Sequence, residues 1–123
     1  MIVEVTRDDF SIDTAVDRLK KPGVGAILTY VGTVREFPSG IGLQFEDDAG
    51  AAEGLRRIAG RAVERFDVDD VAIVHRLGLL RVSERIILVA VSSAHRGPAF
   101  EACSAIVDEI KELHSSWAKE VRQ

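Results

Sequence analysis

Ile86-Ile87-Leu88-Val89-Ala90-Val91 is a continuous apolar run, and Ser92-Ser93-Ala94-His95-Arg96-Gly97-Pro98-Ala99-Phe100 follows it directly. The run predicts a buried strand, and the amphipathic stretch from Ala99 to Leu113 predicts a helix. His95 and Arg96 therefore stand at a strand-to-helix junction. Helix N-termini attract anions through unpaired backbone N–H groups. The junction predicts either a phosphate or carboxylate site, or a turn that His95 caps while Arg96 is solvated.

Outward from this junction, the apolar patterns predict the remaining elements. Strands are expected over residues 2–6, 26–34, 71–74 and 86–91, helices over residues 12–19, 51–66 and 99–117, and a connector or extra strand over residues 77–82. Between residues 35 and 50 the pattern breaks down, and its turn-forming residues predict a long loop with at most a short strand. The order predicts one α+β domain over residues 1–123, with helices packed on a mixed, mainly antiparallel sheet.

Composition narrows the class of protein. The 123 residues are 46% apolar, enough for one core, and the net charge of −4 argues against non-specific nucleic-acid binding. Cys103 is the one cysteine, so no internal disulfide is possible, and its place on the apolar helix face predicts a buried thiol. No run spans a bilayer and the first residues do not resemble a signal peptide, which predicts a cytoplasmic protein.

The residues that could carry chemistry are mainly cations near the ends of elements. His75, His95 and His114 lack metal-ligand spacing, and no glycine-rich nucleotide fingerprint or nucleophile elbow occurs. Lys111 lies at the margin of an apolar helical stripe that ends at Trp117. It is either a partly desolvated amine, able to act as a nucleophile or base, or a surface lysine whose stem covers the core.

Several motifs in order along the chain support a family resemblance. They are Gly32-Thr33-Val34-Arg35, His75-Arg76-Leu77-Gly78, Ser93-Ala94-His95-Arg96 with Ala99-Phe100, then Lys111 and Trp117. With these motifs the chain resembles the large, catalytic subunit of molybdopterin synthase, the MoaE family. The resemblance implies an α/β hammerhead fold and a homodimer that carries a small ubiquitin-like subunit at each end.

The resemblance also implies an activity with no metal or organic cofactor. The thiocarboxylated Gly-Gly tail of the small subunit would deliver sulfur to cyclic pyranopterin monophosphate, forming the dithiolene of molybdopterin. Its implied site residues are catalytic Lys111 and Lys119 and substrate-binding Thr33, Arg35, His95, Arg96 and Glu120. His95 and Arg96 would bind the substrate phosphate, with help from across the dimer.

The chain departs from the family pattern near its C-terminus. Ala118 stands where the family has a second active-site lysine, a lysine follows only at Lys119, and the family's tail continues beyond the position of Gln123. One residue turns a helical side chain by roughly 100°. Two alternatives stay open: a non-catalytic paralogue that binds a ubiquitin-like partner or an anionic metabolite, and an unrelated small-molecule-binding regulatory domain.

Overall fold

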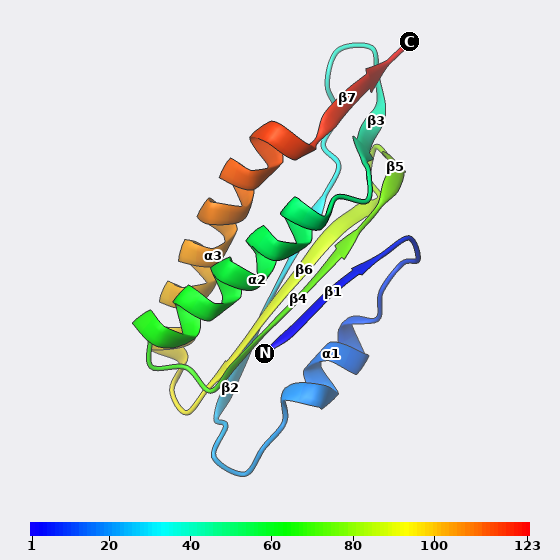
Figure 1. The fold of residues 1–123 in the computed structure, drawn as a ribbon. Helices are drawn as coiled ribbons and strands as arrows, with labels where there is room; N and C mark the ends of the chain where they lie inside the picture. The colour runs from blue at the N-terminus through cyan, green and yellow to red at the C-terminus, as the bar shows by residue number, and fades with distance from the viewer.

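The fold is built around β6 (Arg85–Ser93), a nine-residue strand whose residues from Ile86 onward are all buried. The computed structural model describes residues 1–123 (Figure 1). β6 belongs to a four-stranded sheet in the order β1-β4-β6-β2, with β1 (Ile2–Thr6), β4 (Asp70–Arg76) and β2 (Ala26–Thr33). β1 and β4 run parallel, and the other two pairings are antiparallel. The strand β2, which lies beside the site described below, is an edge of this sheet.

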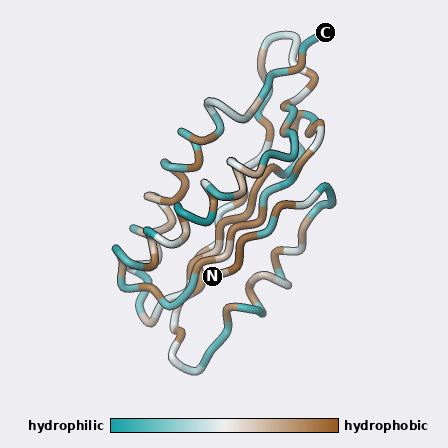
Figure 2. The backbone as a smooth tube through the Cα atoms, viewed as in Figure 1, coloured by the Kyte–Doolittle hydropathy of each residue, from teal (hydrophilic) through white to brown (hydrophobic).

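Helices cover both faces of the large sheet, because successive strand residues point to opposite sides. The helices α2 (Ala49–Arg65) and α3 (Arg96–Trp117) pack on the face that includes Ile73 and Val89. The short helix α1 (Ile12–Leu19) packs on the other face, against Val74 and Ala90 among others. Figure 1 shows this arrangement, and Figure 2 shows the hydrophobic strands between the layers. The α+β class is confirmed, but the expectation of a single sheet is wrong.

A second, three-stranded sheet in the order β5-β3-β7 accounts for the difference. The region expected as a loop contains β3 (Gly40–Phe45), and the expected connector or extra strand is β5 (Gly78–Arg81). The strand β7 (Lys119–Arg122) was not anticipated. β5 and β3 approach closely at Gly42, where a Cβ atom would lie 2.1 Å from the carbonyl oxygen of Leu80. Packing of β3 against β5 therefore requires a glycine at position 42, although the turn-forming residues of this region had suggested a loop.

The helix boundaries differ from the sequence expectation by a few residues. The helix α2 begins after Asp48, whose side chain accepts a hydrogen bond from the backbone N–H of Gly50. The helix α3 begins directly after His95, three residues earlier than expected. No helix is long and apolar enough to cross a membrane.

Candidate functional site

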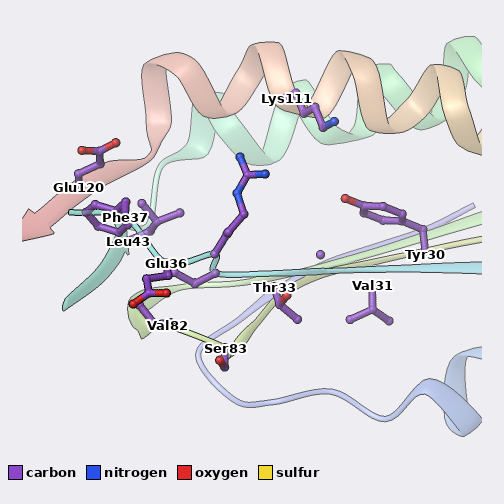
Figure 3. A pocket seen from close by; sticks show the side chains of 13 residues that line it. Tyr30, Val31, Thr33, Glu36, Phe37, Leu43, Val82, Ser83, Lys111 and Glu120 are labelled. Atoms are coloured by element: carbon purple, nitrogen blue, oxygen red, sulfur yellow. The ribbon is translucent and has the colours of Figure 1, made fainter. Parts of the chain in front are cut away.

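An open cavity of about 900 Å³ lies beside the free edge of β2 (Figure 3). Its walls come from β2, the connection to β3, the turn before β6, the helix α3 and the strand β7. The lining residues are Tyr30, Val31, Gly32, Thr33, Val34, Arg35, Glu36, Phe37, Leu43, Val82, Ser83, Lys111 and Glu120. Four of the residues predicted for the site, namely Thr33, Arg35, Lys111 and Glu120, thus line one cavity.

The helix α3 directs Lys111 into this cavity. Its buried residues Cys103, Ile106 and Ile110 form the inward stripe, and Lys111 follows that stripe at the edge nearest β2. Figure 3 shows the Lys111 side chain pointing from α3 into the space above β2, with the Tyr30 side chain rising from the strand below. The Lys111 side chain is exposed and forms no ion pair. Its amine is free to contact a bound molecule.

The end of β2 positions Thr33 and Arg35. Val34 is buried, and its backbone bonds to Glu84 and Ser83 fix the strand end. Arg35 follows as an exposed residue at the cavity wall. A register shift separates Gly32 from Thr33, and Figure 3 shows Thr33 on the opposite side of β2 from Lys111. The Thr33 side chain therefore points away from the lysine, although the residue itself lies at the cavity wall.

The C-terminal strand places Glu120 and Lys119 differently. The indole N–H of Trp117 donates to the carbonyl oxygen of Glu46 at 2.8 Å, which anchors the end of α3. The chain then leaves the helix at Ala118 and pairs with β3, with Glu120 opposite Leu43. Glu120 lines the cavity and Lys119 does not. Because strand residues alternate in direction, the two neighbouring side chains point to opposite faces.

The junction of His95 and Arg96 lies at the other end of α3. His95 occupies the N-cap position without a side-chain capping bond, so the predicted capping role for its imidazole is wrong. The turn is held instead by the Ser93 hydroxyl, which donates to the carbonyl oxygen of His95. A Cβ atom on Gly25 would lie 2.4 Å from the carbonyl oxygen of Ala94, so the neighbouring loop also closes on this turn. His95 and Arg96 are both exposed.

One copy of the chain does not bring this junction to Lys111. Lys111 lies fifteen positions after Arg96 in the continuous helix α3, and at a rise of 1.5 Å per residue this separation is about 22 Å. Neither His95 nor Arg96 lines the cavity. The cavity itself combines Arg35 and Lys111 with the carboxylates of Glu36 and Glu120, so its formal charges balance within the chain.

The structure also contains a pair of histidines, the buried His75 and the half-buried His114, for which the sequence suggested no role. Nε2 of His75 lies 2.8 Å from Nε2 of His114, and Nδ1 of His75 lies 2.7 Å from the carbonyl oxygen of Arg76. Burial lowers the pKa of His75 to about 3, with a further lowering from the charge of His114, and burial lowers the pKa of His114 to about 4. Both rings are therefore neutral near pH 7. The 39 positions between them left no spacing signal in the sequence.

The arrangement defines a class: a small α+β protein with an open cavity of mixed charge and a free lysine amine at a sheet edge. Such a site suits the binding of an anionic molecule and chemistry at a carbonyl or similar electrophile. No group of three or more histidine, cysteine, aspartate or glutamate side chains is placed to hold a metal ion.

Comparison with known proteins identifies the family. The model of the MoaE protein family matches residues 5–113, and the chain belongs to this family. A molybdopterin synthase catalytic subunit of Ralstonia nicotianae is 37% identical over 124 residues, covering 96% of this chain and 70% of that protein.

Solved structures share the fold. A molybdopterin synthase structure from Staphylococcus aureus matches with a TM-score of 0.85 and 28% identity, covering 98% of this chain and 91% of that one. A Helicobacter pylori structure, described as a complex of subunits 1 and 2 of a molybdopterin-converting factor, matches with a TM-score of 0.70 and 18% identity, covering 89% and 77% of the two chains. At that identity the second likeness concerns the fold alone.

Proposed function

We propose that this chain is the catalytic subunit of a molybdopterin synthase, with a role in molybdenum cofactor biosynthesis. In this proposal it transfers sulfur from the thiocarboxylated C-terminus of a small ubiquitin-like subunit to cyclic pyranopterin monophosphate. Family membership and the relatives' names support the role. The observation that carries the proposal is the free amine of Lys111 in a cavity large enough for a substrate and a peptide tail. We place the reaction in the cytoplasm, where the lone thiol of Cys103 would stay reduced.

The proposed chemistry uses Lys111 at the thiocarboxylate and the reacting pterin carbons. Each carrier tail brings one sulfur atom, so a dithiolene needs two transfers. Each transfer forms a C–S bond and breaks a C–O bond at a pterin carbon, and it leaves the carrier as a carboxylate whose new oxygen comes from water. Arg35 would bind an anionic group of the substrate, while Thr33 and Glu120 would contact it at the rim. Lys119 would take part only if its side chain reached the cavity from the opposite face of β7.

A second copy of the chain would complete the site. The substrate phosphate and the carrier thiocarboxylate are both anionic, whereas the cavity charges of one chain cancel. Additional cations are therefore needed to bind both. His95 and Arg96 are exposed and lie about 22 Å from Lys111 along α3. We propose that they reach the cavity of a partner copy in a homodimer and bind the phosphate there.

The test is reconstitution with the thiocarboxylated small subunit and the pterin precursor, with molybdopterin formation as the readout. Lys111→Ala should abolish turnover and leave the circular dichroism spectrum and carrier binding unchanged. Unchanged turnover in Lys111→Ala would remove this lysine from the reaction. Carrier binding without product in the unmodified protein would favour a non-catalytic carrier-binding protein.

Two further variants divide the proposed roles. Lys119→Ala tests the second amine: a loss as large as that of Lys111→Ala places it in the same step, and an unchanged rate leaves Lys111 as the sole catalytic amine. Lys111→Ala mixed with Arg96→Ala tests the dimer. If each site combines Lys111 of one copy with Arg96 of another, mixed dimers recover activity that neither variant has alone. No recovery after exchange of subunits would contradict a shared site.

A further inference from the structure

A smaller inner cavity of about 170 Å³ adjoins the site behind Lys111. It shares Tyr30, Gly32, Thr33 and Lys111 with the outer cavity. Its remaining walls are Ile86, Ile87, Val89, Val107, Ile110 and His114. His114 is thus the one polar side chain that this inner cavity adds to the site. It lies three residues after Lys111, on the same side of α3.

The hydrogen bonds of the histidine pair fix which nitrogen carries each proton. A carbonyl oxygen only accepts, so Nδ1–H of His75 donates to Arg76 and leaves a lone pair on Nε2 of His75. Nε2–H of His114 must then donate to that lone pair. In the neutral ring this leaves the lone pair of His114 on Nδ1. That atom has no partner in the chain and is not enclosed, so it can accept a hydrogen bond from a bound molecule.

The surrounding side chains hold this acceptor in place. The rings of Phe45 and Trp117 pack against the pair. The ring centroids of Phe45 and His114 are 5.1 Å apart, and those of Trp117 and His75 are 4.3 Å apart. The ionisable groups around His114 are His75 from β4, Lys111 from α3 and Tyr30 from β2. No carboxylate lines this inner cavity. The result is a fixed, uncharged acceptor beside a cationic amine.

We propose that His114 is a substrate-positioning residue, whose Nδ1 accepts a hydrogen bond from an N–H group of the molecule that enters the inner cavity beside Lys111. The proposal rests on the proposed function, since it concerns the same reaction. The narrow apolar walls suit an uncharged amide-type N–H group, which either the pterin or the backbone of the carrier tail could supply. This hydrogen bond would make the site specific, because a substrate analogue without the N–H group would leave Nδ1 of His114 unpaired.

Three substitutions separate positioning from structure. His114→Asn places an amide oxygen near the position of Nδ1, His114→Gln keeps a donor toward His75 but loses the Nδ1 acceptor, and His114→Val removes both. KM is measured for the pterin at saturating carrier, and for the carrier at saturating pterin. Ser115→Ala, one residue further along the exposed side of α3, is the matched control.

The proposal predicts that His114→Gln and His114→Val raise one of the two KM values by roughly five- to tenfold, the loss expected for one neutral hydrogen bond. His114→Asn should keep most of the lost affinity, with a KM close to that of the unmodified protein. The substrate whose KM rises in the other two variants is the one that donates the hydrogen bond to Nδ1. Equal behaviour of His114→Gln and the unmodified protein would overturn the proposal and leave His114 only a partner for His75.

Nitrogen NMR of the histidine rings gives an independent readout that needs no turnover. The expected signature is a protonated Nδ1 on His75 and a protonated Nε2 on His114, with the His114 Nδ1 signal shifting when substrate binds. A protonated Nδ1 on His114 at pH 7.5 would also overturn the proposal. Inactivity of the unmodified protein with both substrates would instead contradict the proposed function, and the tautomers would still decide whether the acceptor exists.

Discussion

Acidification should destabilise this protein through the pair formed by His75 and His114. Both rings are neutral in the folded chain, with pKa values of about 3 for His75 and about 4 for His114. In the unfolded chain both titrate near their ordinary value of 6.5, so the unfolded state binds more protons below that pH. The stabilisation is therefore fully present above about pH 6.5 and is lost progressively as the pH falls toward 4.

The size of the effect follows from linkage. At pH 5 each unfolded imidazole is mostly protonated, and excluding that proton from the folded state costs about 2 kcal/mol per ring. Together the two rings remove about 4 kcal/mol between pH 7.5 and pH 5, a large share of a typical stability of roughly 5–15 kcal/mol. With a urea slope of about 2 kcal/mol per M, the unfolding midpoint should fall by about 2 M.

The assay is urea unfolding at pH 7.5, 6.5, 5.5 and 5.0, followed by fluorescence. Trp117 is the only tryptophan and packs against His75, so it reports on the pair directly. The double variant His75→Phe with His114→Leu should lose most of the pH dependence, whatever its stability at pH 7.5. His95→Gln, which replaces the exposed third histidine, should keep it. An equal fall of the midpoint in the double variant and the unmodified protein would refute the reasoning.

Two further predictions concern packing. Gly42→Ala should lower the free energy of unfolding by about 1–3 kcal/mol in urea unfolding, because the new Cβ atom would lie 2.1 Å from the backbone of Leu80. Gly60→Ala is the comparison: this glycine lies inside α2, and the only atom near its Cβ position is the sulfur of Met1 at 4.0 Å. This second substitution should raise the free energy of unfolding by about 0.5–1 kcal/mol. Equal effects of the two would show that the β3–β5 approach is not tight. The thiol of Cys103 is buried, and burial raises its pKa. A disulfide reagent should therefore label Cys103 slowly in the folded protein at pH 8 and rapidly in urea. Fast labelling of the folded protein would contradict the place of Cys103 in the core.

The large sheet and its helices were predictable because their residues repeat with the periods of regular structure. The run from Ile86 to Val91 is buried throughout, and a buried stripe from Ala99 to Trp117 follows the length of α3. The helical spacing also placed Phe100 on this core face, and that expectation is wrong, because the Phe100 side chain is 56% exposed. The lysine at the edge of that stripe could be selected as a candidate for the same reason. These signals are local, so they can be detected in the sequence without knowledge of the fold.

The small sheet carried no such signal. The strand β7 is only four residues long, and its place is decided by the anchor of Trp117 on Glu46 and by pairing with β3. The histidine pair likewise depends on α3 passing over β4, which no spacing in the sequence encodes. The pairing of short strands or of single residues far apart in the sequence is decided by tertiary structure, so sequence periodicity could not predict it.

The distance between His95 and Lys111, in contrast, was implicit in the sequence. The continuous helix α3 places Arg96 and Lys111 about 22 Å apart, too far for one substrate-sized site. In the proposed homodimer, a rigid helix of this length would give each chain two half-sites with a fixed separation. In a two-fold dimer every contact is repeated by symmetry, so two copies would give two complete sites, each with Lys111 and Arg35 from one chain and His95 and Arg96 from the other. The same helix that separates the groups would then set the spacing of the two sites, and the charge balance within each single cavity gives a physical reason for the second copy.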